Sequence, residues 1–213
     1  MKIENFQSQV CVCAASTNLT CTKGRAEMGL NMKHNILVCY KSTTGFTKRY
    51  AEMISGETGC TLMNSRDVTA RIISQYDTIV FGGRLHAGVI DGLKKIRKLI
   101  TKSGGKTFVV FATGAMPLEA EETIQQMWEN NLTPEELRQI PHFYMPGGLC
   151  YEKMPLPDKI MMKAFASVMK RQLRHKENKT PMEQSFEENI STSYDISSKE
   201  YVKPLVSFLK DRK

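Results

Sequence analysis

A cluster of hydroxyl groups follows the first apolar run of the sequence. Residues 36–40 are apolar, and the next stretch, STTGFT at residues 42–47, holds four hydroxyl side chains and one glycine. From Phe46 onward apolar residues recur at helical spacing. A strand, a hydroxyl-rich loop and a helix N-terminus together favour anion binding, because unpaired N–H groups and the positive end of the helix dipole meet there. The pattern predicts a phosphate site.

Other phosphate-binding motifs do not fit this stretch. A Walker A loop needs Gly-Lys followed by Ser or Thr, but Phe46 follows Gly45, and no GxGxxG fingerprint follows a strand. Cys39 cannot be a phosphatase thiolate in a C-x5-R loop, because Gly45 stands where the arginine would be needed. A site for one phosphate monoester is left, and a hydroxyl-rich helix cap without a ligand is the alternative.

Strand and helix patterns alternate along the chain. Strand patterns occupy residues 36–40, 60–63, 76–81, 107–111 and 141–145. Helical patterns occupy residues 46–54, 91–100 and 118–130, and a new helix start with a capping box lies at residues 133–136. We expect the glycine pair Gly82-Gly83 to end the third strand and Gly114 to break the fourth.

This alternation predicts an α/β fold with a parallel, doubly wound sheet. Ligands of such sheets bind beyond the carboxyl ends of the strands. Three loops leave strand ends there, at residues 41–47, 82–88 and 112–117.

The composition predicts one soluble domain. The chain has 213 residues, 41% of them hydrophobic and 24% charged, and no apolar run approaches the roughly 20 residues of a membrane-spanning helix. Residues 1–31 lack strand or helix periodicity, so we expect a disordered extension there and a single domain over residues 32–213. The net charge of +8 favours anionic partners without choosing among them.

The six cysteines are irregularly spaced and form no CxxC pair, which predicts no metal site and a reducing, cytoplasmic location.

Four segments together resemble a known family. STTGFT resembles the [ST]-x-T-G-x-T phosphate loop of flavodoxins, in the same place between first strand and first helix. YDTIVFGGRLHAG, GGLCYEKMPLPDKIMMK and YDISSKEYVKPLVSFL resemble the flavodoxin-domain group that includes menaquinone-dependent protoporphyrinogen oxidase. The resemblance implies a flavodoxin-like three-layer fold with a five-stranded parallel sheet in the order 2-1-3-4-5, and FMN as cofactor.

The resemblance also implies which residues hold FMN. The phosphate would lie against Ser42, Thr43, Thr44, Gly45, Phe46 and Thr47. One side of the flavin ring would face Gly82, Gly83, Arg84, Leu85 and His86, and the other side Ala112, Thr113, Gly114 and Ala115. Glycine suits these loops because backbone must approach a flat ring closely. No catalytic side chain is assigned.

These features predict an FMN-dependent oxidoreductase. The resemblance to the oxidase group implies a large apolar reductant such as a porphyrinogen, with a quinone as acceptor. A one-electron carrier that serves a redox partner and a flavin-free binding or regulatory module are the alternatives. The two ring loops lack the Trp or Tyr that carriers usually place there, and the chain is basic where carriers are typically acidic. We expect no nucleic-acid partner.

Side chains near the ring loops have two interpretations each. His86 could transfer a proton or simply be exposed, and Arg84 could stabilise reduced flavin, contact substrate carboxylates or serve solubility. Tyr144, Tyr151 and Trp128 could form an aromatic wall, although core packing is favoured for Trp128.

Residues 155–174 have the pattern of a basic amphipathic helix. Its apolar positions include Leu156, Ile160, Phe165, Val168, Met169 and Leu173, flanked by lysines and arginines. Such a helix packs on the sheet, docks an acidic partner or lies on an anionic membrane, which would place the protein at the inner face of the membrane. Residues 177–198 are predicted to form a flexible linker before a last helix at residues 199–210.

Overall fold

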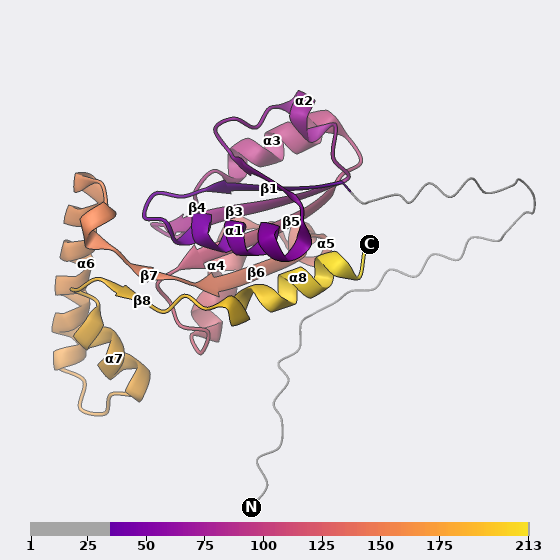
Figure 1. The fold of residues 1–213 in the computed structure, drawn as a ribbon. Helices are drawn as coiled ribbons and strands as arrows, with labels where there is room; N and C mark the ends of the chain where they lie inside the picture. Colours follow the sequence, from indigo (N-terminus) through magenta and orange to yellow (C-terminus); the bar gives the residue numbers. More distant parts are fainter. Residues whose placement is uncertain (1–34, 213) are drawn as a thin grey trace, which may run out of the picture.

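Helices cover both faces of a mainly parallel sheet (Figure 1). The structure, a computed structural model, describes residues 35–212 of the chain. The extension predicted at residues 1–31 lies outside the described residues.

Five parallel strands form the central sheet. They are β1 (Ile36–Lys41), β2 (Thr61–Asn64), β3 (Thr78–His86), β5 (Thr107–Gly114) and β6 (His142–Pro146). Their spatial order is β2-β1-β3-β5-β6, and each neighbouring pair is parallel. The predicted fold class and strand order are therefore confirmed. One short strand, β4 (Val89–Ile90), adds an antiparallel pairing at the end of β3.

The first strand shows how both faces of the sheet become buried. Ile36 and Val38 belong to one core cluster, and Leu37 and Cys39 belong to the other. The helices on the first face are α1 (Phe46–Thr58) and α8 (Lys203–Lys210). Those on the second are α2 (Ala70–Ile73), α3 (Leu93–Ser103), α4 (Glu121–Asn131) and α5 (Pro134–Gln139). Because successive strand residues point to opposite faces, a strand covered on both sides needs an unbroken apolar run.

A smaller unit, called the inserted unit below, lies between β6 and the C-terminal helix. It contains β7 (Gly148–Leu149), the 3-10 helix η1 (Tyr151–Lys153), α6 (Leu156–Arg174), α7 (Pro181–Asn189) and β8 (Tyr194–Asp195). A second 3-10 helix, η2 (Lys199–Val202), then leads into α8. β7 and β8 pair antiparallel, and Leu149, Tyr151, Ala166 and Ile190 form a separate buried cluster. Figure 1 shows α6 and α7 beside the sheet rather than stacked on it.

The structure differs from the prediction of a flexible linker over residues 177–198, because α7 and β8 lie there. Thr180 begins α7 with a capping box: its hydroxyl accepts the Glu183 N–H, and the Glu183 carboxylate accepts the Thr180 N–H. Pro181 occupies the first helical position, and Ile190 anchors the helix in the buried cluster. A local capping signal therefore outweighs the polar composition.

The prediction that Gly82-Gly83 ends the third strand is wrong, because β3 continues to His86. Gly82 pairs with Tyr40 of β1 and with Phe111 of β5. Neither glycine has a positive φ. A Cβ on Gly82 would lie 2.0 Å from Cζ of Phe111, so the glycine makes room for a neighbouring buried ring.

We expect Gly82→Ala to destabilise the fold by about 1 to 3 kcal/mol, since the added methyl group must displace the Phe111 ring. The control is Gly56→Ala in α1, where an added Cβ meets nothing within 4 Å. Alanine there should stabilise the protein by up to about 1 kcal/mol through helix propensity. Urea unfolding measures both changes, and an unchanged free energy of unfolding for Gly82→Ala would contradict the packing argument.

Candidate functional site

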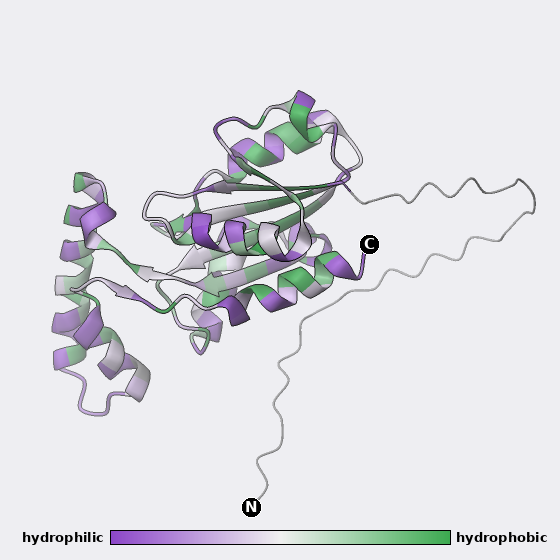
Figure 2. Ribbon diagram, viewed as in Figure 1, coloured by the Kyte–Doolittle hydropathy of each residue, from purple (hydrophilic) through white to green (hydrophobic). Residues whose placement is uncertain are grey.

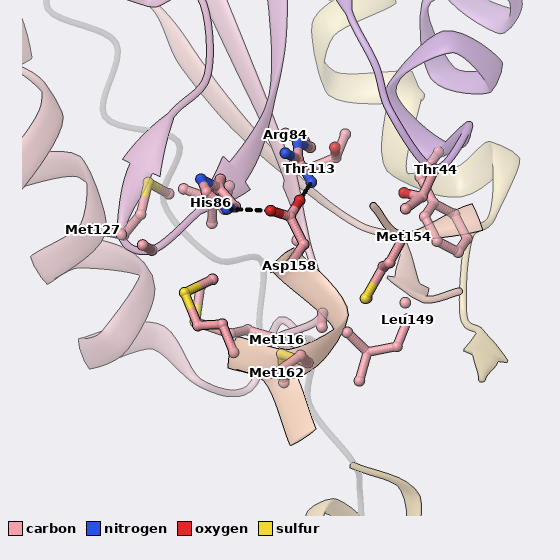
Figure 3. A pocket seen from close by; sticks show the side chains of 18 of the residues that line it. Thr44, Arg84, His86, Thr113, Met116, Met127, Leu149, Met154, Asp158 and Met162 are labelled. Atoms are coloured by element: carbon pink, nitrogen blue, oxygen red, sulfur yellow. Dashed lines mark hydrogen bonds and ion pairs between the residues drawn. The ribbon is translucent and has the colours of Figure 1, made fainter. Parts of the chain in front are cut away.

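Three chain segments meet at the carboxyl edge of the sheet and surround a cavity of about 360 Å³ (Figure 3). Thr44 comes from the loop after β1, residues 84–88 from the end of β3 and its turn, and residues 113–116 from the end of β5. This volume lies within the range of small-molecule sites, about 300 to 1,000 Å³. Because its lining comes from the ends of β1, β3 and β5, the cavity lies where the strand order predicts a ligand.

The loop after β1 presents backbone donors at one end of this cavity. Gly45 has a φ of 105°, a left-handed conformation suited to glycine, and its N–H donates to Ser42 Oγ at 3.2 Å. α1 begins at the next residue. Within residues 35–212 the N–H groups of Phe46, Thr47 and Lys48 donate to no acceptor. Together with the helix dipole they form a site for an anion.

Thr47 ties this loop to the end of β5. Its hydroxyl lies 2.7 Å from the hydroxyl of Thr113, and both side chains are buried. Thr44, by contrast, is partly exposed and lines the cavity. Thr47 therefore has a structural position, whereas Thr44 faces the site.

Charged side chains from β3 and α6 meet at the cavity. Asp158 Oδ2 accepts from Arg84 Nη1 at 2.9 Å, and Asp158 Oδ1 lies 3.1 Å from His86 Nε2, as Figure 3 shows. Partial burial raises the pKa of Asp158, but its contacts with Arg84 and His86 outweigh this and hold the pKa below its usual value. Asp158 is therefore ionised at neutral pH and balances the charge of Arg84.

The same arginine extends the ion-pair network to β1. Arg84 Nε lies 3.5 Å from Asp91, which also accepts from Lys41 Nζ at 2.6 Å. The network joins the last residue of β1, the end of β3 and the first turn of α6. It fixes the polar side of the cavity.

The rest of the wall is mostly apolar. Its large apolar side chains are Leu85, Met116, Met127, Leu149, Met154, Met161 and Met162. Figure 3 places Met154 and Met162 of the inserted unit on the side opposite Met127 of α4. α6 thus closes one side of a cavity that the central sheet leaves open.

The three aromatic residues considered for a ring wall have structural positions instead. The Tyr144 hydroxyl donates to the Met116 carbonyl and accepts the Met116 N–H, both at 3.0 Å, which holds the loop after β5. Tyr151 donates to the Ile190 carbonyl at 2.7 Å, and the Trp128 ring packs in the core. Among the residues that the structure describes, Phe46 is the one Phe, Tyr or Trp that lines the cavity.

The predicted site residues divide into two groups. Those that line the cavity are Thr44, Phe46, Arg84, Leu85, His86, Thr113, Gly114 and Ala115. Those that do not are Ser42, Thr43, Gly45, Thr47, Gly82, Gly83 and Ala112. Gly82, Gly83 and Ala112 lie buried inside strands rather than in loops.

The sequence interpretation missed the contribution of the inserted unit. Asp158, Met154 and Met162 line the cavity, whereas residues 155–174 were considered only for their basic and apolar pattern. One signal was available: Asp158 is the single acidic residue of α6 and lies in its first turn.

Comparison with solved structures finds flavodoxins at low identity. A WrbA-like flavodoxin from Agrobacterium tumefaciens is 20% identical over 60% of this chain and 88% of that chain, with a TM-score of 0.36. Two-electron reduced Megasphaera elsdenii flavodoxin is 16% identical over 57% of this chain and 89% of that chain, with a TM-score of 0.37. Oxidised Flavodoxin 2 from Bacillus cereus is 19% identical over 63% of this chain and 99% of that chain, with a TM-score of 0.34.

A search of curated proteins finds no match to this chain. The family comparison is positive: residues 37–178 match the family described as Flavodoxin domain, and this range includes α6 and the five parallel strands apart from Ile36 at the start of β1. The chain therefore belongs to the flavodoxin domain family.

Proposed function

We propose that this protein binds FMN and acts as an FMN-dependent oxidoreductase. The observation that carries the proposal is one cavity with anion-binding N–H groups at one end and an apolar space between the ends of β3 and β5 at the other. Proteins of the flavodoxin domain family typically bind this flavin. FMN, when bound, supplies a ring that takes up and releases one or two electrons.

The donor set of the first loop fits a phosphate monoester. The Thr44 side chain faces the cavity, and the first N–H groups of α1 lack acceptors within the described part of the chain. Each hydrogen bond to a charged group contributes about 1.5 to 3 kcal/mol. Three or four of them supply a large part of the about 8 kcal/mol that micromolar binding needs.

Arg84 and His86 would lie on the ring side of the cavity. Arg84 would place a positive charge beside the ring, and Asp158 would moderate it by pairing with the guanidinium. In a neutral imidazole, donation from His86 Nε2 to Asp158 leaves Nδ1 as a proton acceptor. The pair therefore offers a fixed positive charge and a proton-exchanging atom beside the ring.

The apolar wall supplied by the inserted unit supports an enzyme rather than a simple carrier. A carrier needs an accessible ring edge, whereas here Met154, Met161 and Met162 of the inserted unit cover one side of the cavity. Such a wall suits a large apolar reductant, and Arg84 can pair with its carboxylates. We propose a protoporphyrinogen oxidase-like reaction, in which three successive two-electron steps convert the porphyrinogen to the porphyrin and reduce three quinones to quinols.

We expect Thr44→Ala to weaken FMN binding about 10- to 100-fold, because one hydrogen bond to a charged phosphate is lost. Riboflavin, which lacks the phosphate, should bind wild type and Thr44→Ala equally. Fluorescence titration of the apoprotein with each flavin measures both affinities.

The matched control is Thr101→Ala, an exposed threonine of α3 remote from the cavity, which should leave both affinities unchanged. Unchanged FMN binding by Thr44→Ala would contradict the phosphate site. If the wild-type protein does not bind added FMN, the result would support the flavin-free module instead.

The charge balance at Arg84 predicts two opposite shifts of the flavin midpoint potential. Asp158→Asn removes a negative charge beside the ring and should raise the potential, whereas Arg84→Gln should lower it, each by on the order of 30 mV. Anaerobic reduction against a reference dye measures both. Shifts of the same sign in the two variants would show that the pair does not act through its charge.

Catalytic turnover distinguishes the enzyme hypothesis from the electron-carrier hypothesis. We expect the FMN-loaded protein to oxidise protoporphyrinogen with a water-soluble menaquinone analogue as acceptor, followed by the fluorescence of the porphyrin formed. FMN binding without turnover, together with electron exchange with a flavodoxin reductase, would favour the carrier.

A further inference from the structure

α6 has an apolar face that no other part of the described chain covers. Leu156, Ile160 and Val168 are 70%, 61% and 55% exposed, and Met161 and Phe165 are also exposed. These five residues are most of the large exposed hydrophobic side chains found in residues 35–212. Packing on the central sheet, one of the interpretations of this helix from the sequence, does not occur for these residues.

The helix already buries a different face. Ala166 packs with Leu149, Tyr151 and Ile190 in the buried cluster of the inserted unit, and Leu173 is also buried. At about 3.6 residues per turn, Ala166 and Leu173 lie on the side of the helix opposite Ile160 and Val168. Core packing therefore accounts for the buried apolar side of α6, with Ala166 and Leu173, but not for the exposed apolar side.

Basic residues lie beside the exposed stripe on one side and also within it. At about 100° per residue, Lys159, Lys163 and Lys170 fall between Ala166 and Leu156 around the helix, and Arg171 falls between Ile160 and Val168. α6 carries Lys159, Lys163, Lys170, Arg171 and Arg174, and none of these forms an ion pair with another described residue. Its single carboxylate, Asp158, is engaged by Arg84 and His86 at the cavity. Figure 2 shows hydrophobic and hydrophilic segments alternating along this helix at the outer edge of the molecule.

We propose that α6 docks the protein on an anionic lipid surface. The exposed apolar side chains would enter the boundary between headgroups and acyl chains, while the lysine stems extend to the phosphates. No helix in residues 35–212 has the length and apolar composition to cross a bilayer. The contact is therefore along the surface, over a helix of about 28 Å.

A flat surface suits the geometry better than a protein groove or a second copy. Since α6 packs against the rest of its unit on one side, it offers one convex face to a partner. A symmetric contact with a second copy would bring the same basic residues together without compensating carboxylates. Anionic lipid offers negative charge and an apolar interior to the same face.

Docking would bring the cavity close to the lipid. Met161 is both exposed on α6 and part of the cavity wall, so the apolar stripe is continuous with the site. An apolar reactant dissolved in the bilayer then has a path into the cavity that avoids water. This last consequence rests on the proposed function, whereas the docking itself does not.

The test is sedimentation of the full chain, without added FMN, with vesicles of phosphatidylcholine alone or mixed with phosphatidylserine. We expect binding to the mixed vesicles only, weakened by salt. Lys159→Gln, Lys163→Gln and Lys170→Gln together should weaken it about 100-fold, because each lysine near an anionic surface contributes about 1 kcal/mol. Ile160→Ser, Phe165→Ser and Val168→Ser together should weaken it at least 10-fold.

Two matched controls test whether the position of the substituted residues on α6, rather than the kind of residue removed, decides binding. Lys94→Gln, Lys98→Gln and Lys102→Gln on α3 change the charge equally, and Leu118→Ser with Ile196→Ser removes exposed apolar groups elsewhere. Both should bind the mixed vesicles like wild type. Thermal unfolding of every variant checks that the fold is intact.

Three outcomes would overturn the proposal. They are equal loss of binding in the α3 and α6 lysine variants, no binding of wild type to either vesicle, and a wild-type dimer in solution that the α6 serine variant makes monomeric. The dimer would assign the face to a second copy. Because no flavin is present, none of these outcomes bears on FMN binding.

Discussion

Parallel pairing of β1, β3 and β5 is the constraint on which the rest of the structure depends. Parallel strands end at the same edge of a sheet, so loops that are distant in sequence become neighbours there. Burial on both faces leaves this edge as the place where polar backbone can meet a ligand. The positions of the loop after β1, the Arg84 network and the turn held by Tyr144 all follow from that geometry.

The inserted unit changes what this edge can do. Asp158 connects α6 to Arg84 and His86, so one carboxylate both closes the cavity and adjusts its charge. Because this carboxylate is ionised at neutral pH and already paired, the unpaired basic residues of α6 remain available on the other side of the helix. One helix therefore contributes a paired carboxylate to the cavity and unpaired basic residues to the surface.

How far the sequence predicted this structure depends on how local each signal is. The strand order and the loop after β1 were predicted because apolar runs, helix starts and the STTGFT pattern are local features. Gly82 was misread as a strand end, because the reason for a glycine is the ring of Phe111 on the neighbouring strand. Asp158 was missed for the same reason: its partners lie more than 70 residues earlier in the chain. Contacts between distant segments decide such positions.

Methionines build most of the apolar cavity wall, and Phe46 is the one aromatic side chain among the described residues that line it. Flat aromatic walls hold a flat ring in one position, whereas methionine is unbranched and adapts to the shape of what it contacts. Met116, Met127, Met154 and Met162 come from four different segments, so their side chains can rearrange independently. Under the proposed function, such a wall would hold the flavin ring and still admit a second apolar molecule beside it, because methionine side chains adapt to more than one shape. A reaction between two bulky partners needs that adaptability, whereas a rigid electron carrier does not.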